Sequence, residues 1–209
     1  MNSHFITFEG PEGSGKTSVI EGVKHRLTQE GYDVLITREP GGVPIAEAIR
    51  NIILDVKNTA LDPITEALLF AASRRQHVLE VIEPALAQGK VVLCDRYVDS
   101  SLAYQGVGRG LGVDTVFELN RFAIRDLLPS RTLFIDVPPK TGLDRIQQRE
   151  GHLDRLDLES LTFHEKVYEG YRQLAQTYPD RIRIIDGLKP LEEVISDATR
   201  ILLETLTKE

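Results

Sequence analysis

The stretch that decides the fold is "HFITFEGPEGSGKTSVIEGVKHRL", residues 4–27. Its centre fits the pattern G-x-x-x-x-G-K-[ST], a loop whose backbone N–H groups face phosphate oxygens. That loop consists of Gly10, Pro11, Glu12, Gly13, Ser14, Gly15, Lys16 and Thr17. Residues 4–9 before it are β-prone, and Val19, Ile20, Val23 and Leu27 after it have helical spacing. Strand, loop and helix in this order predict a phosphate-binding P-loop rather than a chance glycine-rich turn.

Two further residues fit a nucleotide site with a metal ion. In a P-loop, Lys16 reaches the terminal phosphates and Thr17 can bind Mg²⁺. In "CDRY" (94–97), Asp95 ends an apolar run, where a P-loop protein needs an acid for Mg²⁺ or its waters. Arg96 would then face the same cleft; the alternative is a helix-capping aspartate beside a solvated arginine.

The remaining pattern alternates strands with helices. Further strands are expected at 33–37, 90–95, 131–137 and 181–186, and helices at 43–55, 64–88, 113–127, 140–150, 159–177 and 191–206. In the helix over 43–55 the inward positions are expected to be Ile45, Ala46, Ile49, Ile52 and Ile53. This order predicts an α/β fold of the P-loop kinase type, a five-stranded parallel sheet with helices on both faces and ligands at the carboxyl ends of the strands.

Composition limits the function classes. A chain of 209 residues suits one domain, and 25 Lys+Arg against 32 Asp+Glu give a net charge of −7. This balance disfavours general binding to nucleic acid or acidic membranes, although a local basic pocket is compatible with it. No signal peptide or membrane span is predicted, so we expect a cytoplasmic protein. The single Cys94, in an apolar run, is expected to be buried and reduced.

The strings NKxD and DxxG of GTPases do not occur, which disfavours a GTPase switch.

Three segments outside the loop are further candidates for a role in binding or catalysis. Phe70 and Arg74 share a helical face. They suit either a pocket for a planar base or a core aromatic beside a surface charge. The second interpretation, Phe70 in the core and Arg74 on the surface, is the better one for this segment alone. "DSSLAYQG" (99–106) offers groups that can bind a sugar or base, or a helix cap at Ser100 or Ser101. The charged residues 144–157 suit a mobile lid.

The order and spacing of "FEGPEGSGKT", "TREPGG", "FAASRRQH", "LCDRYVDSSLAYQG" and "LDRLD" resemble bacterial thymidylate kinases over essentially the whole chain. The resemblance implies transfer of the ATP γ-phosphoryl group to dTMP, in dTTP biosynthesis, by a homodimer that uses Mg²⁺. It also implies a lid over about 142–157. Another nucleotide kinase, or an ATP-dependent switch without a small-molecule acceptor, remains the alternative.

The same resemblance assigns the acceptor site. Phe70 resembles the residue on which thymine stacks, and Arg74 resembles the residue that donates to thymine O4. Cytosine carries a hydrogen-bond donor in place of the O4 acceptor, so an arginine there disfavours cytosine. Gln105 resembles the amide at the other base edge, Ser100 and Ser101 line the pocket, and Tyr104 resembles the wall that excludes a ribose 2′-hydroxyl. The residues that resemble those around the acceptor phosphate and the 3′-hydroxyl are Glu39, Arg50 and Arg96.

The catalytic arginine is expected in the lid. One branch of the family carries this arginine in the P-loop, but the variable positions of this loop contain none. The lid carries Arg145, Arg149 and Arg155, which resembles the other branch. Spacing does not decide among them; Arg149 is favoured, with Arg155 second. The catalytic set is therefore expected to be Lys16, Arg96, Arg149 and Arg155.

Overall fold

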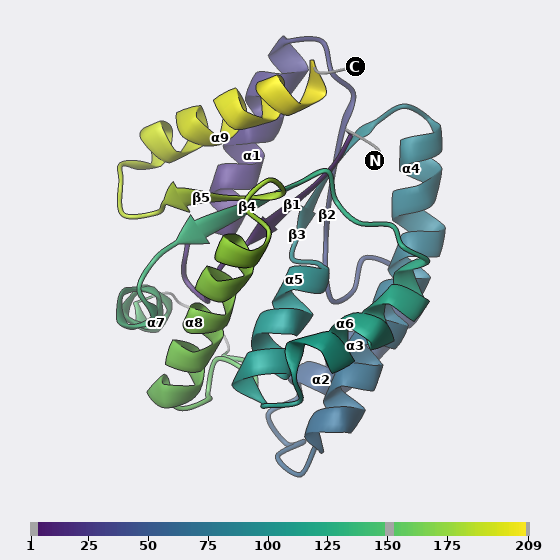
Figure 1. Cartoon of the computed structure of the whole chain (residues 1–209), viewed down its shortest axis with the longest axis vertical. Coiled ribbons are helices and arrows are strands. Elements are labelled where there is room, and N and C mark those ends of the chain that lie inside the picture. Colours follow the sequence, from purple (N-terminus) through teal and green to yellow (C-terminus); the bar gives the residue numbers. More distant parts are fainter. Residues whose placement is uncertain (1–3, 149–152, 208–209) are drawn as a thin grey trace.

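The structure, a computed structural model, describes residues 4–148 and 153–207. One parallel sheet runs through it (Figure 1), in the order β2-β3-β1-β4-β5. The strands are β1 (Phe5–Glu9), β2 (Val34–Arg38), β3 (Val91–Asp95), β4 (Arg131–Asp136) and β5 (Ile182–Asp186). All five strands expected from the sequence are confirmed, each within about a residue of its expected bounds.

The helices are α1 (Lys16–Gln29), α2 (Pro44–Leu54), α3 (Pro63–His77), α4 (Glu83–Ala87), α5 (Val98–Ser101), α6 (Val113–Ile124), α7 (Pro139–Gln147), α8 (Leu161–Thr177) and α9 (Leu191–Leu206). Two of these helices, α3 and α8, begin at a residue whose side chain caps the first turn. The Asp62 carboxylate accepts from the Thr65 N–H at α3, and the Ser160 hydroxyl accepts from the Phe163 N–H at α8.

Successive strand residues pack on opposite faces of the sheet, so the protein has two apolar layers. Ile6 and Phe8 of β1 pack with α1 and α9, whereas Phe5 packs with α3, α5, α6 and α8. Figure 1 shows α1 and α9 together on one side of the sheet and the larger helical layer on the other. Among the described residues no helix has the length and apolar character to cross a membrane.

The structure corrects one expectation for α2. In α2, Ala46 and Ile53 are buried as expected, but Ile45 and Ile52 are about half exposed, so their inward assignment was wrong. No helix was expected over 98–108, where α5 continues into a largely buried π-helical segment, η2 (Leu102–Gly108). Three of the four residues of α5 are the short polar residues Asp99, Ser100 and Ser101, which conceal the apolar spacing of a helix.

The helix expected over 64–88 is present, with one irregularity. Between α3 and α4 lies a π-helical turn, η1 (Val78–Ile82). Pro84 follows directly. Proline has no N–H to donate and its ring crowds the carbonyl four residues earlier, so a widened turn accommodates it. The polypeptide therefore continues in one helical direction from Pro63 to Ala87.

Candidate active site

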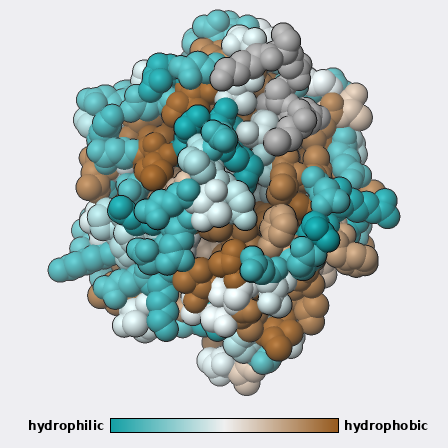
Figure 2. Space-filling model, viewed as in Figure 1, coloured by the Kyte–Doolittle hydropathy of each residue, from teal (hydrophilic) through white to brown (hydrophobic). Residues whose placement is uncertain are grey.

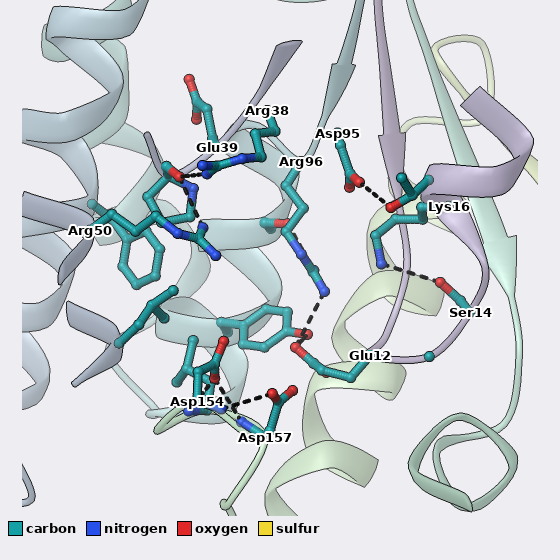
Figure 3. Close-up of a pocket in the computed structure, with 18 of the residues that line it drawn as sticks. Glu12, Ser14, Lys16, Arg38, Glu39, Arg50, Asp95, Arg96, Asp154 and Asp157 are labelled. Atoms are coloured by element: carbon teal, nitrogen blue, oxygen red, sulfur yellow. Dashed lines mark hydrogen bonds and ion pairs between the residues drawn. The ribbon is translucent and has the colours of Figure 1, made fainter. Parts of the chain in front are cut away.

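A cleft of about 450 Å³ opens where the strands end. The P-loop forms one wall, and residues of α2, α3, α5 and η2 form the opposite wall (Figure 3). Leu153, Asp154, Leu156 and Asp157, in the expected lid, also line it. The location agrees with the rule that open parallel sheets bind ligands beyond the carboxyl ends of their strands.

Close packing fixes the P-loop backbone. Gly10 has a φ of +147°, and a Cβ there would lie 2.7 Å from the Ile135 carbonyl oxygen. Gly13 has a φ of +68°, and a Cβ there would lie 2.0 Å from the Gly142 oxygen in α7. Both positions therefore need glycine, which lets the loop turn its N–H groups inward at the start of α1.

Lys16 lies inside the P-loop. Its Nζ donates to the carbonyl oxygens of Gly10 and Pro11, each at 3.0 Å, and to the Ser14 Oγ at 3.2 Å. Burial, followed by the nearby Arg96 charge, lowers the pKa of Lys16 to about 8. An anionic phosphate in the loop would favour the charged ammonium, as a phosphate-binding lysine requires.

Asp95 and Thr17 meet because their strands are neighbours. Phe8 in β1 is paired with Asp95 in β3, so the residues after β1 lie beside the end of β3. The Thr17 hydroxyl donates to the Asp95 carboxylate at 3.3 Å. Hydroxyl and carboxylate oxygens suit a hard cation such as Mg²⁺, which typically takes only one or two protein ligands beside phosphates and waters. The donor set therefore fits Mg²⁺.

Arg96 connects the two walls of the cleft. It has a φ of +68°, unusual for a non-glycine residue, and its side chain points across the cleft toward Glu12 (Figure 3). The Arg96 Nη2 lies 3.2 Å from the Glu12 Oε1, and the Tyr104 hydroxyl donates to the same oxygen. Burial alone would raise the pKa of Glu12, but the Arg96 charge and hydrogen bonds from His164 and Tyr104 lower it to about 2. Glu12 was expected only as a loop residue; its side-chain role was missed.

A buried carboxylate behind the cleft supports Arg96. Glu9 accepts from the Tyr97 N–H at 2.7 Å and from the Ser100 hydroxyl at 2.5 Å, while Arg96 donates to the same hydroxyl at 3.3 Å. Ser100 lies inside α5, and Ser101, at the N-cap position of η2, makes no side-chain capping hydrogen bond, so the capping interpretation was wrong. Burial, and then the Asp99 charge, raise the pKa of Glu9 to about 7.

Arg74 lies in the core and borders the cleft. Its side chain is 2% exposed, so the surface-charge interpretation was wrong. The Nε donates to Glu39 at 2.6 Å, and the other nitrogens donate to Ser101 (3.0 Å), the Tyr97 carbonyl (3.0 Å) and the Asn120 side chain. Phe70, one helical turn earlier, lines the same cleft. The two residues form an aromatic platform beside a fixed guanidinium.

Glu39 acts as the buried counterion of this group. Its second oxygen lies 2.9 Å from the His77 Nδ1, and the His77 Nε2 lies 2.6 Å from the Thr37 hydroxyl. Both carboxylate oxygens are thus occupied, so Glu39 orients Arg74 in addition to lining the cleft. His77 and Asn120 were missed because their partners are distant in the chain.

The other expected residues also line the cleft. These are Arg50, Ser101, Tyr104 and Gln105. Arg38, which was not expected in the site, lines the cleft as well. Arg50 points into the cleft (Figure 3). Arg38 pairs with Glu47 at 2.7 Å, so its charge is partly balanced. The Cys94 thiol is fully buried, as expected, and burial raises its pKa well above the usual value.

The expected lid arginines occupy different places. Arg145, at the end of α7, donates to the Gly13 carbonyl of the P-loop at 3.4 Å. Arg155 donates to the buried Glu66 at 2.5 Å and to the Ile53 carbonyl at 2.8 Å. Arg149 lies outside the described residues.

The comparisons with known proteins agree with one another. A model of the thymidylate kinase family matches residues 8–198. A thymidylate kinase of Geobacillus thermodenitrificans is 56% identical, covering 99% of this chain and 92% of its own. One from Latilactobacillus sakei is 55% identical, covering 98% and 96%. The crystal structure of thymidylate kinase from Ehrlichia chaffeensis, 34% identical, has a TM-score of 0.76 and covers 95% of this chain and 97% of its own.

Proposed function

The chain belongs to the thymidylate kinase family and transfers the γ-phosphoryl group of ATP to dTMP, and we propose how its residues do so. The P-loop holds the donor phosphates, and the wall formed by Phe70, Arg74, Tyr104 and Gln105 holds the thymine nucleotide. The observation that supports this division is the position of Arg96, between the P-loop and the opposite wall (Figure 3).

The acceptor needs no general base. The phosphate of dTMP is ionised at neutral pH, with a second pKa of about 6, so its oxygen is already a nucleophile. Catalysis then depends on bringing two anions together in line and on stabilising the charge between them. Lys16 contacts the donor phosphates, Arg50 contacts the acceptor phosphate, and Arg96 lies where the transferred group passes.

A metal ion and a lid arginine complete the proposal. Thr17 and Asp95 would hold Mg²⁺, which would neutralise part of the charge on the donor phosphates. Arg149 supplies the lid guanidinium. Its rival Arg155 is paired with a buried carboxylate, and Arg145 contacts a loop carbonyl.

The protein is further proposed to be a homodimer that functions in the cytoplasm. Several large apolar side chains on neighbouring helices are at least 48% exposed: Ile45 and Ile52 of α2, Ile64 and Leu68 of α3, and Phe122 of α6. These helices lie together in the lower right of Figure 1, and Figure 2 shows apolar surface there. An apolar surface of this kind favours association with a second copy.

An acceptor panel tests the proposed function. ADP formation from ATP is measured with dTMP, dUMP, dCMP and thymidine, with a reaction without acceptor as control. Preferred turnover of dTMP is expected, with thymidine inactive because it lacks the acceptor phosphate. Equal turnover of dCMP would contradict the assignment of the base pocket, and hydrolysis that is unchanged by any acceptor would favour an ATP-dependent switch.

A further inference from the structure

One buried carboxylate lies directly behind the base-binding wall. Glu66, in the first turns of α3, is completely buried. It precedes Phe70 by four residues and Arg74 by eight, so the three share one face of the helix. Phe70 and Arg74 line the cleft, and Glu66 continues the same face behind them.

Three side chains donate to Glu66. Its Oε1 accepts from the Gln105 Nε2 at 2.9 Å and from the Arg109 Nε at 3.2 Å. Its Oε2 accepts from the Arg109 Nη2 at 3.1 Å and from the Arg155 Nη2 at 2.5 Å. These hydrogen bonds outweigh burial and hold the pKa of Glu66 below its usual value. Glu66 is therefore a carboxylate at neutral pH, which can only accept hydrogen bonds.

This contact determines which end of the Gln105 amide faces the cleft. An amide has a donor end and an acceptor end, and only the NH₂ group can face a carboxylate. With the NH₂ group of Gln105 on Glu66, the carbonyl oxygen is the end left for a ligand, and Gln105 lines the cleft. Thymine carries an N–H at position 3, whereas cytosine has an unprotonated acceptor nitrogen there.

We infer that Glu66 is a positioning residue for base selection: its carboxylate holds the Gln105 amide with the oxygen toward the base, which favours bases that carry an N–H at position 3. This inference rests on the proposed binding of dTMP in the cleft. Arg74 and Gln105 then select independently, one against the amino group of cytosine and the other against its ring nitrogen.

The test compares Glu66→Gln with the wild-type protein. A neutral amide at position 66 can accept or donate, so Gln105 becomes free to turn. The ratio of kcat/KM for dTMP over dCMP should fall about tenfold, which is typical for one mismatched hydrogen bond at a base edge. The change should disappear in a Gln105→Leu background, because Glu66 acts through that amide. An unchanged ratio, or an equal change in both backgrounds, would overturn the inference.

A matched control separates positioning from general destabilisation. Asp99 is 2% exposed and pairs with Arg181 at 2.6 Å, but neither residue lines the cleft. Asp99→Asn also removes the negative charge of a buried ion pair and should leave the base preference unchanged. If it lowers the ratio as much as Glu66→Gln does, the effect is a consequence of destabilisation and the inference fails.

Two further measurements cover a variant that does not fold. The carboxylates of Glu66 and Glu159 balance the charges of Arg109 and Arg155, and Arg109 pairs with Glu159 at 2.6 Å. Replacing both Glu66 and Arg109 by Gln therefore keeps the net charge of this cluster at zero. This double variant should show the same loss of preference for dTMP over dCMP. The wild-type protein should bind dTMP about tenfold more tightly than its 3-deaza analogue, in which a C–H replaces the N–H at position 3. Equal affinities would overturn the inference, whereas inactivity of the wild-type protein with dTMP would refute the proposed function itself.

Discussion

Arg74 provides the sharpest test of the site, because its removal should affect stability and base preference together. The Arg74→Ala substitution leaves Glu39 buried without its main counterion and removes the donors to Ser101, Asn120 and the Tyr97 carbonyl. Breaking a buried ion pair by removing one partner costs about 3–5 kcal/mol. For a chain of this size, that loss corresponds to a decrease in Tm of roughly 6–20 °C.

Thermal unfolding followed by circular dichroism measures the decrease. Arg26→Ala is the control, since the Arg26–Glu192 pair has a similar distance of 2.9 Å but side chains that are 33% and 82% exposed. An exposed pair contributes little, so this variant should change the Tm by less than about 4 °C. A second variant, Arg74→Met, also removes the guanidinium. Adding Glu39→Gln to Arg74→Met should raise the Tm above that of Arg74→Met alone, because no uncompensated charge is then buried.

The base preference gives the second readout. Folded Arg74→Met should show a smaller ratio of kcat/KM for dTMP over dCMP, because the guanidinium that repels the cytosine amino group is absent. A Tm of Arg74→Ala within 2 °C of the wild-type value would refute the stabilising role of the buried Arg74–Glu39 ion pair. An unchanged ratio would refute the role of Arg74 in base recognition, even if the protein were destabilised as expected.

Four further outcomes are expected. Lys16→Ala should abolish turnover with an unchanged circular dichroism spectrum, and near-normal activity would contradict the P-loop assignment. Arg149→Ala should lower kcat with little change in KM for dTMP; if Arg155→Ala does this instead, the lid arginine was chosen wrongly. Phe122→Glu, on a residue 88% exposed, should halve the mass found by light scattering, and a monomeric wild-type protein would refute the dimer. Burial raises the pKa of Glu9 from 4.5 to about 7, so as the pH rises the unfolded chain loses this proton before the folded chain does. The contribution of Glu9 to the free energy of unfolding should therefore fall by on the order of 3 kcal/mol between pH 4.5 and 7. Denaturant titrations of Glu9→Gln should lack this decrease, and an identical pH dependence would contradict it.

The sequence predicted what short-range patterns encode. Residues 4–27 contain a complete strand, loop and helix, and apolar runs identify the remaining strands. Burial of Arg74 could not be predicted in this way, because its partners Glu39 and Asn120 come from segments 35 and 46 residues away. A helical spacing shows that two residues share a face, but it does not show whether that face meets solvent or a polar core. The same reason explains the wrong assignment of Ile45 and Ile52.

The charge balance of the cleft explains why the lid matters. The P-loop contributes the carboxylate of Glu12 to the cleft, where it contacts Arg96. The pKa of Glu12 is about 2, so this carboxylate is ionised at neutral pH. It pairs with Arg96, as Glu47 pairs with Arg38, so neither arginine adds a full positive charge. Arg74 is paired with Glu39 in the same way, so among the described residues of the cleft Lys16 and Arg50 remain to oppose about six negative charges on ATP and dTMP. The deficit requires cations in addition to these side chains. We therefore expect the reaction to depend strongly on Mg²⁺ and on a guanidinium from the lid, more than in a kinase whose P-loop carries an arginine.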